Sequence, residues 1–176
     1  MAQDKVQVNL RGMFFALLVV IILIIFGIGT LTNADPLWFL PVFNEVPQRI
    51  VVYQGGCRAQ VMKGQFGFDE ITSAINQSLP QYEGFNGAFG VSADSLKDLR
   101  EKERALEVFY AKPVTIHAPY RFGHPEALLI PLSGYFAEGR SVFGGKSGDY
   151  WAGALRLKSI ELIQRAADLV SCAPYP

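Results

Sequence analysis

The hydropathy pattern is dominated by one uninterrupted apolar run near the N-terminus. From Met13 to Leu31 no residue is charged, and Thr30 is the only polar side chain. In a helix this run spans about 28 Å at about 1.5 Å per residue, close to the roughly 30 Å hydrocarbon thickness of a bilayer. Apolar residues surround the whole helix and leave no polar face for solvent. The pattern predicts a single transmembrane anchor over 13–32.

A cleaved signal peptide is the competing interpretation of the same run. Such peptides have an apolar core of about 7 to 15 residues followed by small residues at the cleavage site. The stretch Thr32-Asn33-Ala34 could serve as that site. The apolar run here is longer than a typical signal-peptide core, which favours a retained signal anchor.

The charges that flank the run predict its orientation. Lys5 and Arg11 precede it, and Asp35 is the first charge after it. Because positive residues concentrate on the cytoplasmic side of membrane spans, residues 1–12 are predicted to form a cytoplasmic tail. The rest of the chain is then predicted to lie outside the cytoplasm, on the far side of the cell membrane.

Aromatic and proline residues predominate just after the predicted span. Trp38, Phe39 and Phe43 are residue types that favour the membrane–water interface. Three prolines among them prevent a continuous helix. Residues 33–48 are therefore predicted to form a juxtamembrane collar at the membrane surface.

The remaining residues, 49–176, alternate between strand-like and helix-like patterns. Gly55-Gly56 separates two strand-like stretches and predicts a hairpin. Strands are expected at 49–54, 57–62, 105–111, 114–118, 127–136, 140–145 and 150–157, and helices at 68–79, 96–107 and 159–170. The order predicts one α+β domain with a mostly antiparallel sheet and about three helices, packed to one side of it. Pro131 within its strand predicts an edge position or a bulge.

Charge and cysteine content limit the classes of function. Sixteen basic residues balance sixteen acidic ones, without the clustered basic surface that nucleic-acid binding requires. The two cysteines, Cys57 and Cys172, lie on the side of the membrane where disulfides persist and are predicted to form a bridge. Two free buried thiols are the alternative. No nucleic-acid partner, redox CxxC pair or attached haem is expected.

The stretch Gly144-Gly145-Lys146-Ser147 resembles part of a phosphate-binding loop. A Walker A motif needs a glycine six positions before its lysine, and Arg140 occupies that position. The loop should also lead into a helix, whereas 150–157 is strand-like. We therefore interpret the stretch as a hairpin turn and expect no bound nucleotide.

The two histidines lie in one proline-interrupted loop that also contains Tyr120 and Arg121. His117 and His124, with Glu126, could supply three ligands to a metal, but a fourth is not evident. Either histidine could act as a general base, yet no nucleophile motif accompanies them. We interpret His117, Tyr120, Arg121 and His124 as a candidate pocket or interface, with no catalytic residue, metal or cofactor assigned.

Together these features favour a noncatalytic, single-pass accessory or stabilising subunit of a larger bacterial membrane complex, with an electron-transfer assembly as one example. Its partners would be the lipid bilayer and other membrane-protein subunits. The alternative is an extracytoplasmic ligand-binding or sensing module built around the histidine loop. An enzyme that uses the two histidines is the less favoured interpretation.

Overall fold

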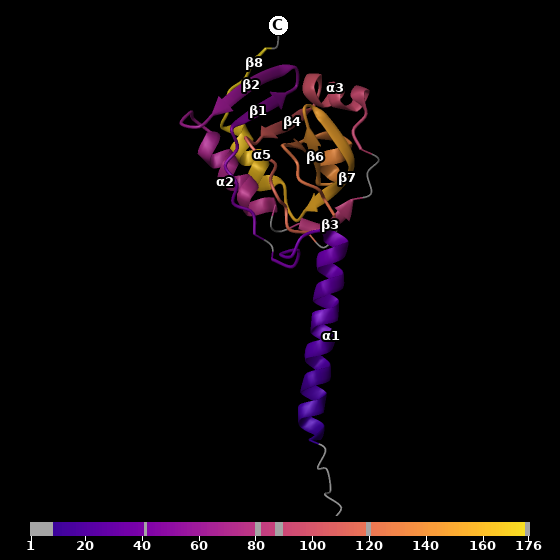
Figure 1. The fold of residues 1–176 in the computed structure, drawn as a ribbon. Coiled ribbons are helices and arrows are strands. Elements are labelled where there is room, and N and C mark those ends of the chain that lie inside the picture. The colour runs from indigo at the N-terminus through magenta and orange to yellow at the C-terminus, as the bar shows by residue number, and fades with distance from the viewer. Residues whose placement is uncertain (1–8, 41, 80–81, 87–89, 119–120, 175–176) are drawn as a thin grey trace, which may run out of the picture.

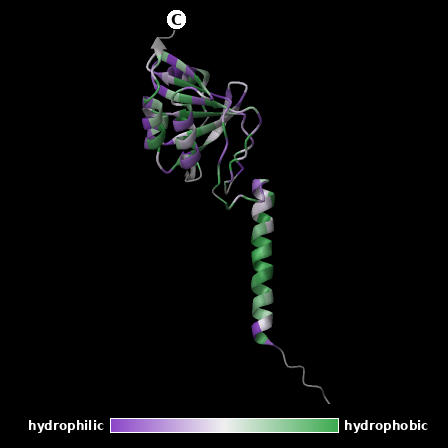
Figure 2. Cartoon of the chain, turned by 90° about the vertical axis from the view of Figure 1, so that its left-hand side faces the viewer, coloured by the Kyte–Doolittle hydropathy of each residue, from purple (hydrophilic) through white to green (hydrophobic). Residues whose placement is uncertain are grey.

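A computed structural model describes residues 9–40, 42–79, 82–86, 90–118 and 121–174 of the chain. The apolar run forms helix α1 (Leu10–Asn33), which extends away from a folded C-terminal domain (Figure 1). Figure 2 shows a continuous apolar middle part of α1 with polar residues at both ends, and the domain buries none of the apolar window. By length and composition α1 can cross a bilayer, although a signal sequence would meet the same criterion. The helix suggests a membrane anchor.

Helix α1 is slightly longer than the apolar run because polar groups define its ends. The side chain of Asn9 accepts a hydrogen bond from the Gly12 amide at 3.2 Å, which caps the first turn. At the other end Ala34 takes a left-handed conformation with φ of 54°. The next residue, Asp35, accepts a hydrogen bond from the Leu37 amide at 2.8 Å. The helix therefore stops where the predicted collar begins.

The strands that the structure describes form one sheet of eight, and the fold is α+β as predicted. All the paired neighbours are antiparallel, in the order β3-β7-β6-β5-β4-β1-β2-β8. The strands are β1 (Arg49–Gln54), β2 (Cys57–Met62), β3 (Tyr82–Asn86), β4 (Arg104–Phe109), β5 (Ala127–Pro131), β6 (Ser141–Lys146), β7 (Asp149–Leu157) and β8 (Ala173–Pro174).

The helices cover both faces of the sheet, so the prediction that they pack on one side is wrong. Helices α2 (Phe68–Ser78) and α5 (Glu161–Asp168) share a hydrophobic core with one face. Helix α3 (Ala93–Glu101) packs on the opposite face through Leu96 and Leu99, and the short α4 (Gly134–Glu138) contacts β5 and β6. The central strands β1, β4 and β5 carry apolar residues on both faces, which requires cover on both sides.

Pro131 does not mark an edge strand. Strand β5 lies between β4 and β6 in the interior of the sheet, and Pro131 is its last residue, paired with Ala105. At that end the missing amide hydrogen costs the ladder little, because the strand stops there. The predicted edge position or bulge is therefore corrected to a strand terminus.

Two local sequence features have the structures predicted for them. Lys146 pairs with Asp149 across a two-residue turn in which Ser147 and Gly148 both have positive φ, so the glycine-rich stretch is a hairpin turn. The cysteines form the disulfide Cys57–Cys172, whose Cα atoms are 5.6 Å apart. It links the start of β2 to the segment that leads into β8, and these two strands also pair.

Candidate functional site

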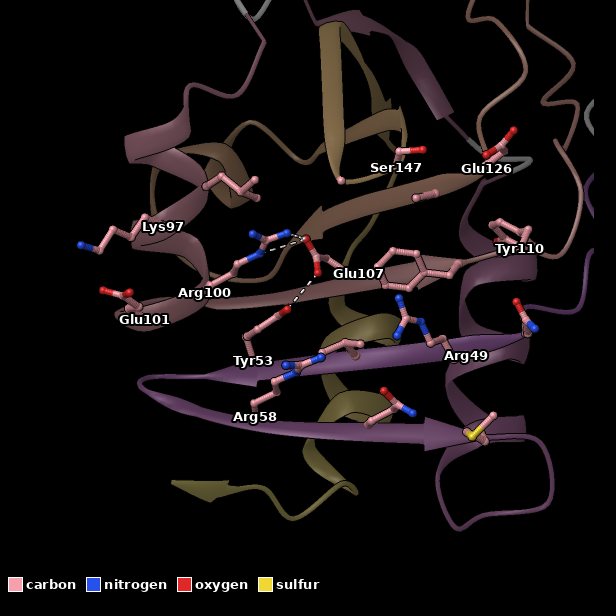
Figure 3. Close-up of a pocket in the computed structure, with 18 of the residues that line it drawn as sticks. Arg49, Tyr53, Arg58, Lys97, Arg100, Glu101, Glu107, Tyr110, Glu126 and Ser147 are labelled. Carbon is pink, nitrogen blue, oxygen red and sulfur yellow. Dashed lines mark hydrogen bonds and ion pairs between the residues drawn. The ribbon is translucent and has the colours of Figure 1, made fainter. Parts of the chain in front are cut away.

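A groove of about 1370 Å³ lies on the sheet face that α3 only partly covers. Strands β1, β2 and β4 form its floor, and α3 forms a wall (Figure 3). Strand register explains which side chains share this floor. Tyr53 is paired with Arg58, Val51 is paired with Glu107, and side chains two residues apart lie on the same face. The groove therefore combines apolar, aromatic and charged groups from segments far apart in sequence.

Glu107 is the buried acid of the groove, with only 2% of its surface exposed. Its carboxylate accepts hydrogen bonds from the Tyr53 hydroxyl at 2.9 Å and the Tyr150 hydroxyl at 3.2 Å. Arg100, from α3, donates from Nε at 3.1 Å and also forms an ion pair with it. Three donors from three different elements converge on one carboxylate, so the network ties α3 to the sheet.

Protonation of the surrounding groups is consistent with this structural role. Burial, the charge of Glu107 and the hydrogen bond to Glu107 together raise the pKa of Tyr53 to about 12. Burial also raises the pKa of Tyr150, again with a contribution from Glu107. Burial alone would lower the pKa of Arg100, but the hydrogen bond and charge of Glu107 outweigh burial and raise it. Both hydroxyls therefore remain donors well above neutral pH.

Two arginines of the groove floor have no acidic partner among the described residues. The guanidinium carbon of Arg49 lies 4.1 Å from the centroid of the Phe109 ring, a cation–π contact that leaves its charge uncompensated. Arg58 projects from β2 into the same groove (Figure 3). Neither forms an ion pair with a described residue, whereas Glu126 on the opposite wall is paired with Lys146 at 2.6 Å.

The histidine loop, predicted as a candidate pocket or interface, contacts the segment after α1. The Nδ1 atom of His117 lies 2.7 Å from Oδ2 of Asp35, a hydrogen-bonded pair between residues 82 positions apart. His124 contacts the Thr115 hydroxyl at 3.2 Å and lines a cavity of about 70 Å³ with Arg121. Small-molecule pockets are usually about 300 to 1000 Å³. Tyr120 lies outside the described residues. The loop joins the domain to its anchor, and its cavity is too small for most ligands.

The aromatic residues assigned to the collar separate into two groups. Trp38 packs against Gly29 so closely that an added Cβ there would lie 2.7 Å from its ring, and Phe39 stacks edge-on with Phe26 at 6.0 Å. Both therefore fold back onto the last turns of α1. Phe43 is only 6% exposed and packs against Tyr110 with ring centroids 6.2 Å apart. Phe43 belongs to the domain core, which corrects its assignment to the membrane interface.

Sequence reasoning missed the groove because its residues do not form a local motif. The one available signal was Glu107, a lone acid within the apolar stretch 105–109. A charge inside a strand that is otherwise buried must find partners, and such charges are rarely buried unless they are paired. The partners themselves come from β1, α3 and β7, and their spacing in the sequence does not reveal the meeting point.

Comparisons with known proteins do not show to which family the chain belongs. No protein-family model matches it, and no curated protein matches it. Among solved structures, the crystal structure of YycH from Bacillus subtilis aligns with a TM-score of 0.45 and 10% sequence identity, covering 73% of this chain and 36% of that one. The chain thus spans about a third of the length of that protein. A likeness at this level carries no functional argument, so the function must be inferred from the groove and the anchor.

Proposed function

We propose that the protein is a noncatalytic, single-pass subunit of a larger bacterial membrane complex, with its domain outside the cytoplasm. In this role the domain holds a partner subunit in the groove between α3 and the β1–β2 hairpin. The observation that carries the proposal is the groove itself, which is large, partly apolar and lined by two arginines without acidic partners in the described structure. Such surfaces are typical of protein contacts, where arginine and aromatic residues are enriched.

The contacts of the candidate catalytic groups support a binding role. Glu107 is surrounded by three donors of its own domain, and the pair between His117 and Asp35 fixes the loop near α1. A general base must reach a substrate proton, and Glu107 is directed into this internal network. Glu107 and His117 are thus engaged in contacts that hold the fold together.

The anchor and the disulfide support the proposed location. Arg11 precedes the apolar helix and Asp35 follows it, which favours a cytoplasmic N-terminus. The Cys57–Cys172 disulfide is of the kind that persists outside the reducing cytoplasm. The two observations are independent, and both favour a domain on the extracytoplasmic side.

A sensing module is the second candidate function, and one contact favours it. The pair between His117 and Asp35 connects the domain to the residues just after α1. A movement of the histidine loop would therefore shift the C-terminal end of the helix. A sensor would still need an occupant for the groove. The two candidates differ in whether that occupant stays bound as a stoichiometric subunit.

Purification of the full chain from native membranes tests this proposal. With a C-terminal affinity tag, native expression levels and mild detergent, we expect one or more membrane proteins to co-purify in stoichiometric amounts. Charge reversal in the groove, Arg49→Glu with Arg58→Glu, should reduce their recovery at least about tenfold, because a groove with two uncompensated arginines favours a partner surface of opposite charge, which the glutamates would repel. The matched control is Lys112→Glu with Lys158→Glu, two exposed lysines outside the groove lining. A wild-type chain recovered alone as a monomer would contradict the proposal.

A further inference from the structure

The groove floor presents its side chains in three rows set by the strand register. The rows are Arg49 with Met62 and Phe109, then Val51 with Gln60 and Glu107, then Tyr53 with Arg58. The two unpaired arginines thus occupy the first and third rows. From Arg49 to Tyr53 is four residues along β1, which corresponds to about 13 Å at about 3.3 Å per residue.

When the charges that are already paired are left out, the groove carries a positive charge at the first row and at the third row. Arg100 is neutralised by Glu107, and Glu126 is neutralised by Lys146. Besides the two arginines, Lys97 and Glu101 line the groove from α3 and offset each other in sign. An occupant that matches this pattern carries two negative charges about 13 Å apart.

The remaining lining mixes polar residues such as Gln60 with apolar residues that can contact a side chain placed between those charges. Leu96 and Phe109 are partly exposed and line the groove near the middle row, whereas Val51 in that row is only 1% exposed and packs in the same apolar cluster. An extended peptide advances about 3.3 Å per residue and directs every second side chain to the same side. Acidic residues at positions i and i+4 with an apolar residue at i+2 would therefore meet the three rows in order.

The size and position of the groove favour one kind of negatively charged occupant, an acidic polypeptide, over a free anion or a lipid headgroup. Its volume of about 1370 Å³ exceeds the usual range of about 300 to 1000 Å³ for small-molecule sites. Figure 1 shows β2 and α3 at the end of the domain opposite α1, so a bilayer that holds α1 lies on the far side of the domain. An acidic polypeptide fits these constraints better than a free anion or a lipid headgroup.

We propose that the groove binds an extended acidic segment of a partner protein with the pattern acid-x-apolar-x-acid, its two carboxylates paired with Arg49 and Arg58. This inference rests on the proposed function, because it names the chemistry of the partner. Recognition of acidic motifs by arginine clusters is an established mode of peptide binding. The pattern reads the same in both directions, so the segment can run either way along β1.

Fluorescence anisotropy with defined peptides tests this inference on the full chain in detergent. The probe is a labelled peptide of about twelve residues whose centre is Glu-Ser-Leu-Ser-Glu, and its neutral twin replaces both glutamates with glutamine. We expect the acidic probe to bind at least about tenfold more tightly than the twin, because two charge-assisted pairs are lost. A third peptide moves one glutamate by a single position to the opposite side, and it should bind as weakly as the neutral twin.

Variants of the chain locate the binding. Arg49→Gln with Arg58→Gln should weaken the acidic probe about tenfold, whereas Lys112→Gln with Lys158→Gln should leave its affinity unchanged. If the arginine variant does not fold, the three peptides on the wild-type chain still decide the question. Equal binding of the acidic probe and its twin, no binding of any probe, or full binding by a folded arginine variant would each overturn the inference.

Parallel measurements test two other occupants of the groove, an anion or lipid headgroup and a second copy of this chain. Arginine-dependent binding of inorganic phosphate or phosphatidylglycerol vesicles, without peptide binding, would assign the groove to an anion or a lipid and overturn the inference. Arginine-dependent dimerisation without peptide binding would assign it to a second copy, with the same consequence. Co-purification of a partner that depends on both arginines, without binding of the acidic probe, would leave the proposed function standing and remove only this inference. If the chain binds the acidic probe but no other protein co-purifies with it, the inference about the groove stands and the proposed subunit role is overturned.

Discussion

Replacing Glu107 with alanine is expected to lower the free energy of unfolding by about 3–5 kcal/mol. The carboxylate is 2% exposed and accepts from Tyr53, Tyr150 and Arg100. Removal of the acid leaves the two hydroxyls and the guanidinium without their partner, and an uncompensated charge in a partly buried site is costly. Urea unfolding of the full chain in detergent, followed by tryptophan fluorescence, measures the loss.

Two further variants test whether the loss of stability comes from breaking the buried charge network or from shortening any glutamate side chain. Glu101→Ala removes an exposed acid from the same groove lining and should change stability by less than about 0.5 kcal/mol. Replacing Glu107 and Arg100 together with leucine should recover only part of the loss, since it removes the orphaned guanidinium but still leaves the Tyr53 and Tyr150 hydroxyls without an acceptor. An unfolding midpoint for Glu107→Ala equal to that of Glu101→Ala would contradict the structural role assigned to this network.

Removal of the disulfide is expected to have the second large effect. Replacing Cys57 and Cys172 with serine should lower the free energy of unfolding by about 2–4 kcal/mol, because the bridge restricts a long loop of the unfolded chain. The bridge joins residues 115 positions apart, which places it among the long loops for which the entropic effect is greatest. It also secures the two-residue β8 to β2 at the edge of the sheet.

The measurement compares urea unfolding of the wild-type chain with and without a reductant. Reduction should lower the stability of the wild type to that of the serine variant, and it should leave the variant unchanged. Because α2 and α5 pack through a continuous core with the sheet, the reduced chain should keep its secondary structure in the absence of urea. A wild-type chain whose stability is the same in reductant and oxidant would contradict the stabilising role of the bridge.

Local patterns predicted the elements of this fold better than their arrangement. The apolar run identified α1, and Gly55-Gly56 identified the β1–β2 hairpin, because both signals lie within a short stretch of sequence. The boundary between α3 and β4 was predicted poorly, since 96–107 has helical composition throughout. In the structure the helix ends at Glu101, and the Gly55 amide bonds to the Glu103 carbonyl before β4 begins. Long-range sheet pairing decided that boundary.

The candidate site was less predictable than the fold, for a related reason. His117 and His124 drew attention because histidine chemistry can be recognised from residue type alone. The structure joins His117 to Asp35, a partner that no local motif could suggest. Conversely, Arg49 and Arg58 are unremarkable in sequence and become significant only because β1 pairs with both β2 and β4. Residue type indicates possible chemistry, but the sheet register determines which groups meet.

The proposed role requires the domain to lie on the extracytoplasmic side of the membrane. Protease digestion of a C-terminally tagged chain, in intact spheroplasts and in inverted membrane vesicles, measures this directly. We expect the domain to be cleaved when protease is added outside spheroplasts and protected inside inverted vesicles, because Arg11 and the N-terminus should stay in the cytoplasm. Protection in spheroplasts with cleavage in inverted vesicles would contradict the account, because the domain would then face the reducing cytoplasm.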